Sequence, residues 1–273
     1  MELKFTKMQG AGNDFILVDV RNEDPGNWSE LAVRLAHRRF GVGCDQLLLL
    51  KNSDRADYRM EILNSDGSEV EMCGNGIRCF ARYLRSRNLC DKEEIAVETL
   101  AGIQLCRFEG EMVVVDMGVP EFEGSKIPTK ATGFVREEPL KLDDGNVLIT
   151  CVSMGNPHAV IFVDEVESYP IGVVGPKVEN HPFFPRRTNV EFIQVLGRNK
   201  LRMRVWERGA GITMACGTGA CASAVAAYWT GRGERETEVV LDGGSLFIRW
   251  DGETEHVFLT GPGVEVFTGC FTL

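Results

Sequence analysis

The sequence predicts a mixed α+β protein of two pseudo-symmetric domains, in each of which a mixed β-sheet curls like a barrel around a central α-helix. Three observations support this fold class. Matching motifs recur at a constant spacing, because Cys216-Gly-Thr-Gly follows Cys73-Gly-Asn-Gly by 143 residues. Strand patterns outnumber helix patterns along the 273 residues. One helix pattern is small or apolar on all sides, so other elements must enclose it.

The strand patterns are of two kinds. Short apolar runs indicate strands that are buried on both faces, and strict alternation of apolar and polar residues indicates strands with one exposed face. The predicted strands are 15–18, 46–50, 58–63, 112–115, 160–163, 190–196, 201–206, 238–241, 246–250 and 257–259.

Three helices are predicted. The first follows Ser29 as its N-cap, with Trp28 and Val33 as a hydrophobic staple at its start. The second follows Cys73 and the third follows Cys216. The second has apolar residues at helical spacing on one face, whereas the third, which includes Ala220–Ala227, is the one that must be enclosed.

The repeat divides the chain into two domains. We expect a first domain over residues 1–118 and a second over 119–263, with a final strand over 264–273 that packs back on the first. Residues 169–187 contain four prolines and are expected to form an ordered loop of the second domain.

Composition excludes several functions. A net charge of -10 and a pI near 5.1 argue against partners such as nucleic acid or anionic membranes. The first residues lack a signal-peptide pattern and the longest apolar stretch, 220–229, is too short to span a bilayer, so a cytoplasmic protein is expected. Nine cysteines without a Cys-x-x-Cys motif, beside only four histidines, predict neither a disulfide framework nor a metal site.

The two Cys-Gly-x-Gly motifs predict a pair of reactive thiols. A helix N-terminus favours the thiolate, because its free N–H groups and the helix dipole stabilise negative charge. The glycines Gly74 and Gly217 let the backbone approach a ligand, so that their amides can hold a carboxylate. Two thiols facing each other across a cleft could take a proton from one face of a carbon and return one to the other face.

Polar residues near these motifs suit an amino-acid substrate. Arg208 could grip a carboxylate in a bidentate manner and Glu207 an ammonium group. Asparagine both donates and accepts, so several together match an ammonium and a carboxylate side by side. The asparagines in loop positions are Asn13, Asn64, Asn75 and Asn189. The aspartates Asp14, Asp45 and Asp66 are expected to be structural turn or cap residues.

These motifs together resemble the diaminopimelate epimerase family over nearly the whole chain. They include Met8-Gln-Gly-Ala-Gly-Asn-Asp-Phe, Gly41-Val-Gly-Cys-Asp-Gln, Met72-Cys-Gly-Asn-Gly-Ile-Arg-Cys, Met154-Gly-Asn-Pro-His, Trp206-Glu-Arg-Gly-Ala-Gly and Ala215-Cys-Gly-Thr-Gly-Ala-Cys. The resemblance implies interconversion of LL- and meso-diaminopimelate without a cofactor, a step towards lysine and peptidoglycan. It also implies an active site in the cleft between the two domains, and a homodimer.

The resemblance carries roles over to individual residues. Cys73 and Cys216 match the two catalytic bases, and His158 and Glu207 match positions that assist them. The positions that match substrate-binding residues are Asn13, Gln46, Asn64, Gly74, Asn75, Asn156, Asn189, Glu207, Arg208, Gly217 and Thr218.

Two alternatives stay open. A proline or hydroxyproline racemase shares the fold and the two cysteines, but proline has only one carboxylate and a secondary amine. Glu207 and Arg208 with Asn64 and Asn189 would then be surplus. A thiol redox or metal-binding protein would instead have a reversible Cys73–Cys216 disulfide or bound zinc as its functional state.

Overall fold

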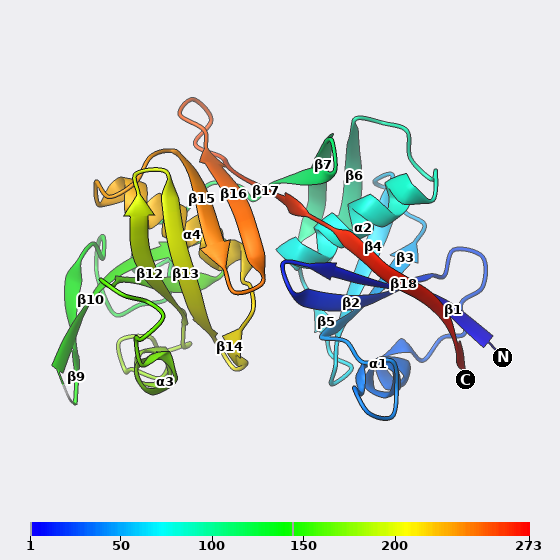
Figure 1. Ribbon diagram of the computed structural model, residues 1–273, viewed down its shortest axis with the longest axis horizontal. Helices are drawn as coiled ribbons and strands as arrows, with labels where there is room; N and C mark the ends of the chain where they lie inside the picture. The colour runs from blue at the N-terminus through cyan, green and yellow to red at the C-terminus, as the bar shows by residue number, and fades with distance from the viewer. Residues whose placement is uncertain (1, 144) are drawn as a thin grey trace. The chain divides into compact units, whose positions relative to one another are not determined.

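The computed structural model describes residues 2–143 and 145–273 of the chain. Contacts between residues divide it into two compact units, the first comprising Met1–Val115 with Thr260–Leu273 and the second Asp116–Leu259. The chain passes from one unit to the other within β8 and returns within β17 (Figure 1).

The first unit is built from helices α1 and α2 and a mixed sheet. Its helices are α1 (Trp28–Ala36) and α2 (Gly74–Ser86). Its strands are β1 (Glu2–Gly10), β2 (Asn13–Asp19), β3 (Gln46–Lys51), β4 (Tyr58–Asn64), β5 (Glu69–Val70), β6 (Glu94–Thr99), β7 (Gly102–Glu109), β8 (Met112–Asp116) and β18 (Val264–Thr272). The sheet runs β18, β1, β2, β3, β4, β6, β7, β8, and the pairs β2–β3 and β4–β6 are parallel.

The second unit repeats this plan. Its helices are α3 (Ile171–Glu179) and α4 (Gly217–Trp229). Its strands are β9 (Glu138–Leu142), β10 (Gly145–Ser153), β11 (Pro157–Phe162), β12 (Asn189–Gly197), β13 (Lys200–Glu207), β14 (Gly211–Thr213), β15 (Glu236–Leu241), β16 (Gly244–Trp250) and β17 (Val257–Pro262). The order β9, β10, β11, β12, β13, β15, β16 has parallel pairs at β11–β12 and β13–β15, as at the equivalent places of the first unit.

The duplication extends to the register of the strands. Phe15 pairs with Gln46 between β2 and β3, and His158 pairs with Asn189 between β11 and β12, each 143 residues later. The four helices obey the same spacing, since α3 begins 143 residues after α1 and α4 begins 143 residues after α2. The predicted pair of similar domains is therefore confirmed in the backbone.

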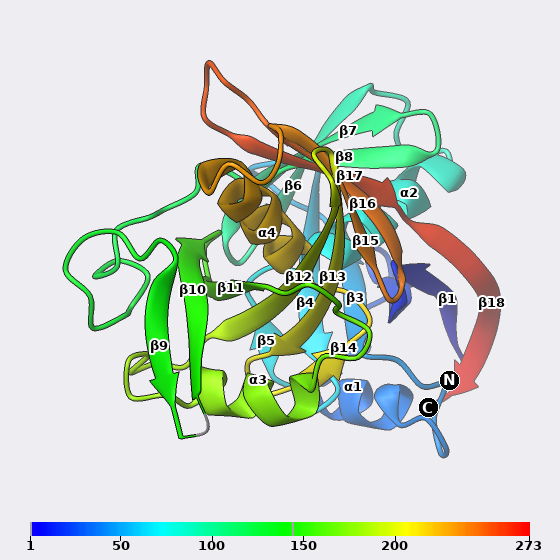
Figure 2. The same cartoon turned by 60° about the vertical axis from the view of Figure 1, so that its left-hand side comes forward.

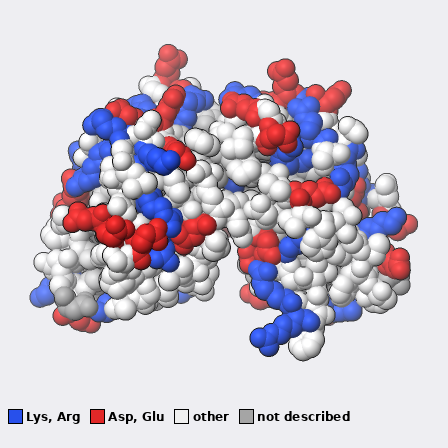
Figure 3. Space-filling view, in the orientation of Figure 1, with Lys and Arg blue, Asp and Glu red and all other residues white. Residues whose placement is uncertain are grey.

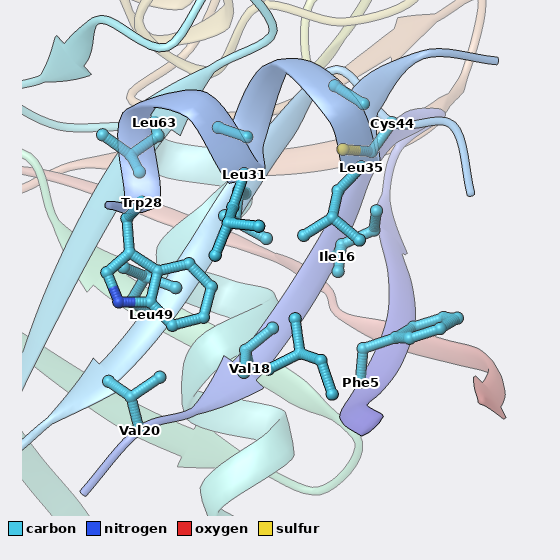
Figure 4. Close-up of a cluster of buried hydrophobic side chains, with 14 residues drawn as sticks. Phe5, Ile16, Val18, Val20, Trp28, Leu31, Leu35, Cys44, Leu49 and Leu63 are labelled. Carbon is cyan, nitrogen blue, oxygen red and sulfur yellow. The ribbon is translucent and has the colours of Figure 1, made fainter. Parts of the chain in front are cut away.

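Each sheet has a helix on both faces. Along β3, Leu47 and Leu49 belong to the apolar cluster under α1, whereas Leu48 points to the other face, beside α2. Figure 4 shows the first cluster, in which Trp28 and Leu35 of α1 lie over the strands. This two-sided burial explains why β3 reads as a continuous apolar run.

Helix α4 is the enclosed helix that the sequence predicted. It contacts β10, β11, β12, β13, β15 and β16, and it lies against β12 and β13 in two views (Figures 1 and 2). Its residues through the middle are alanine, cysteine, serine and valine, and they are buried on all sides. Small side chains allow the strands to approach the helix axis closely.

Three local predictions were wrong. The N-cap of α1 is Asn27, in a left-handed conformation with φ 55°, and Ser29 instead donates its hydroxyl hydrogen bond to Gly67. Val33 is exposed, so it forms no staple with buried Trp28. The stretch predicted as an ordered loop contains helix α3. The first turn of this helix is apolar, and Pro176 lies in its second half.

The charged side chains of both signs are interspersed on the face of each unit that Figure 3 shows. Within the described residues, no helix combines the length and the apolar character needed to cross a membrane.

Candidate active site

Cys73 and Cys216 occupy the same structural position in the two units. Each is the N-cap of a helix of 13 residues, with extended backbone angles of φ -138° and ψ 112° at Cys73 and φ -125° and ψ 112° at Cys216. Each Sγ accepts a hydrogen bond from the backbone N–H three residues on, of Gly76 or Gly219, at 3.4 Å. Gly74 and Gly217 are the first residues of the helices, so their N–H groups lack partners within the helix.

In the first unit, Cys73 lies beside two of the predicted asparagines. Its thiol is 3.6 Å from Asn13 Oδ1, which also accepts from Asn75 Nδ2 at 3.4 Å. Asn13 follows the turn between β1 and β2, and Asn75 is in the first turn of α2. The strand end and the helix start therefore bring these three predicted residues together.

Asp45 fixes the orientation of Asn13. Its Oδ2 accepts from Asn13 Nδ2 at 2.7 Å, so the amide oxygen of Asn13 faces the thiol. Arg38 bridges Asp45 and Asp14 at 2.7 Å from each. Although burial raises the pKa of Asp14, hydrogen bonds from Arg38 and Lys7 and their positive charges lower it to about 2. Asp45 was predicted to be a turn residue, but it also orients a site residue.

Arg78 is a fully buried cation inside α2. It donates to the Gly74 carbonyl and to Asn75 Oδ1, at 2.9 Å each, and to the Pro262 carbonyl at 3.2 Å. The guanidinium thus holds the side chain of Asn75 and the first residue of the helix. Its five donors suit this cluster of neutral oxygens.

Gln46 and Asn64 form a second polar group at the ends of β3 and β4. Gln46 Nε2 donates to Asn64 Oδ1 at 3.0 Å, and Asn64 donates to Ser68 Oγ at 3.1 Å. Gln46 Oε1 is buried and has no hydrogen-bond partner among the described side chains and backbone. Buried polar atoms are almost always paired, so an unpaired oxygen is unusual. It is available as an acceptor for a ligand.

In the second unit Cys216 is buried, and its surroundings are acidic. Burial raises the pKa of the Cys216 thiol, and the carboxylates of Glu207 and Glu191 raise it further. The Thr218 hydroxyl, 3.5 Å from Sγ, and the Gly219 N–H lower it, but the pKa stays well above the ordinary value. From the helix N-terminus alone, the sequence analysis predicted a lowered pKa for this thiol. Burial and the two carboxylates outweigh the effect of the helix N-terminus.

His158 is fully buried between two side chains. Its Nδ1 lies 2.7 Å from Glu191 Oε1, and its Nε2 lies 2.9 Å from Asn156 Oδ1. Glu191 is also fully buried, and its Oε2 has no hydrogen-bond partner among the described residues. The predicted residues His158 and Asn156 are thus joined to a carboxylate that the sequence analysis did not single out.

The ends of β12 and β13 hold the remaining predicted residues. Asn189 Nδ2 donates to the Pro157 carbonyl at 3.0 Å, and its Oδ1 accepts from the Arg208 N–H at 2.9 Å. Thr213 donates to Glu207 Oε1. The Arg208 side chain is exposed and donates to the Arg186 carbonyl at 3.2 Å, so its guanidinium has further donors for a ligand.

A signal for Glu191 is present in the sequence. A charged residue stands inside the buried run Val190–Ile193, where glutamate is rare unless it is paired. Asp45 and Arg78 give no comparable signal, because their partners depend on how distant segments meet. No group of three or more potential metal ligands occurs in the part of the chain that the structure describes.

Comparison with known proteins gives a consistent result. The family model described as diaminopimelate epimerase matches residues 5–123 and 150–266. The chain is 56% identical over 278 residues to the diaminopimelate epimerase of Moorella thermoacetica, covering 99% of this chain and 100% of the relative. It is 48% identical over 273 residues to that of Acetivibrio thermocellus, covering 98% of each.

Solved structures share the fold at low identity. A phenazine biosynthesis protein of the PhzF family from Bacillus anthracis aligns over 100% of both chains with a TM-score of 0.72 at 18% identity. A hydroxyproline epimerase from Agrobacterium vitis aligns over 99% of this chain and 91% of its own with a TM-score of 0.70 at 16% identity. These structures support the architecture, while the family match and the identities of about half over full length show that the chain belongs to the diaminopimelate epimerase family.

Proposed function

We propose that this protein interconverts LL- and meso-diaminopimelate by a two-base proton transfer between Cys73 and Cys216. In one direction one cysteine, as thiolate, takes the α-proton. The other, as thiol, gives a proton to the opposite face of the same carbon, and the roles exchange in the reverse direction. The observation that carries the proposal is the shared backbone position of the two thiols, each at the start of a 13-residue helix that begins with a glycine.

The glycines supply the second requirement of the reaction. Loss of the α-proton moves negative charge onto the substrate carboxylate, which preorganised donors must stabilise. The N–H groups of Gly74 and Gly217 are free of helical partners and suit this role. We assign Asn75 and Thr218, which follow these glycines, to the same carboxylate.

The remaining polar residues suit the distal amino-acid end of the substrate. Arg208 matches a carboxylate, and Glu207 with the vacant oxygen of Gln46 matches an ammonium group. The other residues assigned to substrate binding are Asn13, Asn64, Asn156 and Asn189, and His158 assists the thiols. A substrate with two different ends explains why Gln46 and Asn64 are replaced by Asn189 and Glu207 in the repeat.

We also propose that the reaction uses no cofactor and that the enzyme is a cytoplasmic homodimer. The family and the acidic composition support these statements. The positions assigned to chemistry contain two thiols, one imidazole and one carboxylate, which are sufficient for proton transfer.

The test is exchange in heavy water with Cys73→Ser and Cys216→Ser. A thiol carries one proton, so the wild-type enzyme should place deuterium in the product at early conversion and leave unreacted substrate unlabelled. Each variant should lose about 100- to 10,000-fold in kcat, as expected for loss of a general acid or base. Cys270→Ser, which removes an exposed thiol, is the matched control. Near-wild-type turnover by either serine variant would refute the two-base mechanism.

A substrate panel separates the alternatives. Turnover of proline or hydroxyproline but not of LL-diaminopimelate would favour the racemase that shares the fold. A reversible disulfide or bound metal as the functional state, with no epimerisation, would favour the thiol redox or metal-binding protein.

A further inference from the structure

The two half-sites differ in the pair of side chains beneath the first turn of the helix. In the first unit the pair is Phe15 and Leu48, which would lie 3.3 and 3.2 Å from a Cβ placed on Gly76. In the second unit the same positions, 143 residues on, hold His158 and Glu191. An apolar support beneath Cys73 is therefore replaced by an ionisable pair in the half-site of Cys216.

Glu191 lies directly against the start of α4. Its Oε1 would be 2.7 Å from a Cβ placed on Gly219, so only glycine leaves room for the carboxylate there. Gly219 is also the residue whose N–H bonds to the Cys216 thiol. The carboxylate and the thiol thus share one turn of the helix.

A buried carboxylate is costly, and this one is only half satisfied. Oε1 pairs with His158, but Oε2 is buried without a partner among the described residues. Desolvation of such a group destabilises a fold unless hydrogen bonds offset it. Leu48 shows that the same place in the duplicated unit is filled by an apolar residue, so packing alone does not require glutamate.

Glu191 also controls the orientation of a predicted site residue. The two ring nitrogens of His158 each face a side-chain oxygen, Nδ1 that of Glu191 and Nε2 that of Asn156, so the ring is held in place between these two side chains. Asn156 is the counterpart of Asn13, which in the first unit is oriented by Asp45 and contacts Cys73. Each half-site therefore has a carboxylate that orients its asparagine, directly in one and through histidine in the other.

The charged groups that act on Cys216 come from neighbouring strands. Glu191 is on β12 and Glu207 is on β13, and both disfavour a thiolate. His158 on β11 is held between Glu191 and Asn156, and Cys151 on β10 is a second thiol within the field of Glu191. The two carboxylates disfavour a negative charge on the Cys216 thiol. His158 contacts Glu191.

We propose that Glu191 is a positioning residue that makes the two thiols unequal. It fixes the His158 ring against Asn156, and its charge beneath the first turn of α4 holds Cys216 as the protonated thiol of the resting enzyme. Cys216 is then ready to donate to the carbon while Cys73 as thiolate receives the α-proton. One proton leaves the carbon for Cys73 and one arrives from Cys216, so after turnover Cys73 must lose its proton to solvent and Cys216 must take one up. This assignment rests on the proposed two-base function.

The test is the pH dependence of alkylation at each cysteine, measured with iodoacetamide and peptide mass spectrometry in the absence of substrate. In the wild type the midpoint for Cys216 should lie above that for Cys73. Glu191→Gln keeps the shape of the side chain and removes its charge, so the Cys216 midpoint should fall by about one pH unit, equivalent to a tenfold rise in thiolate at fixed pH. Glu238→Gln, at a surface acid of β15, is the control and should leave both midpoints unchanged.

Two further variants divide the effects of charge and orientation. Glu191→Leu, which copies the first unit, should lower the Cys216 midpoint and also reduce kcat more than Glu191→Gln, because it releases the His158 ring. His158→Gln should reduce kcat but keep the Cys216 midpoint high. An unchanged Cys216 midpoint in folded Glu191→Gln would overturn the proposal.

The wild type alone keeps the proposal testable if the variants fail to fold. A Cys216 midpoint equal to or below that of Cys73 would overturn it without any substitution. The alkylation experiment uses no substrate, so failure of wild-type epimerisation would overturn the proposed function and leave the unequal thiols a separate result.

Discussion

Helices α2 and α4 begin in the same way and then differ in character. Both cap their first turn with a cysteine and leave room under that turn with a glycine. Helix α2 carries three arginines, one of them fully buried, whereas α4 has no charged residue. The position of the thiol therefore depends on the backbone at the start of the helix. The composition of the rest of each helix differs with the residues that surround it.

The largest difference concerns the buried Arg78, whose counterpart in α4 is Cys221. Arg78→Met should destabilise the first unit by about 3 kcal/mol, since Asn75 Oδ1 and the Pro262 carbonyl lose a charged donor. Cys221→Ala should cost the second unit only about 1 kcal/mol. Hydrogen exchange of peptides from each helix measures the two units separately. Equal losses in both variants would contradict a special role for the guanidinium.

A smaller effect is expected from the two glycines under the thiols. An alanine at Gly76 meets Leu48 and Phe15 at 3.2 and 3.3 Å, and the helix propensity of alanine offsets this crowding. An alanine at Gly219 would press on Glu191 Oε1 at 2.7 Å and displace it from His158.

Gly219→Ala should therefore destabilise by about 1–3 kcal/mol, while Gly76→Ala stays near neutral. Thermal unfolding gives the stabilities, and the NMR signals of the His158 ring report whether its hydrogen bond changes. A larger loss of stability for Gly76→Ala than for Gly219→Ala would contradict the expected difference between the side chains beneath the two glycines.

The effect that is smallest at neutral pH, because it develops only on alkaline titration, is shared by both units. Burial raises the pKa of the thiols of Cys44, Cys79 and Cys106 in the first unit to about 12, and it raises those of Cys151 and Cys216 in the second. A raised pKa in the folded state means that the stabilisation is complete below the thiol pKa of the unfolded chain and is lost as the pH rises from there towards 12.

Each such thiol should lower the free energy of unfolding by about 1.4 kcal/mol per pH unit across that window. Urea unfolding of the reduced protein at a series of alkaline pH values measures this slope. Cys106→Ala should reduce the slope, whereas Cys270→Ala, at an exposed thiol, serves as the comparison. A slope that Cys106→Ala does not change would contradict the raised pKa of that thiol.

Much of the fold could be predicted from the sequence because it depends on local chemistry. A cysteine, two glycines and an apolar run were sufficient to predict α2 and α4, and alternation was sufficient for the strands. Helix α1 was predicted with the wrong cap, because the left-handed angles of Asn27 are set by the surrounding chain. Helix α3 was missed because its glycines and proline conceal an apolar first turn.

The supporting residues of the site could not be predicted in the same way. Glu191 meets His158 across 33 residues, and Asp45 meets Asn13 across 32. Such pairs exist only after parallel strands have aligned, here β11 with β12 and β2 with β3. The 143-residue repeat contains a usable signal for Glu191, because the residue 143 positions earlier is the apolar Leu48.

The pairing of β1 with β18 has a consequence for how the chain is made. Glu2 lies opposite Thr272, so one edge of the first unit is completed by a segment that the ribosome produces after the whole of the second unit. The second unit is contiguous and can fold as it emerges. Until β18 arrives, β1 keeps an unpaired edge that can capture other strands. Slow synthesis of residues 116–259 would therefore lengthen the period in which the nascent chain is prone to aggregate.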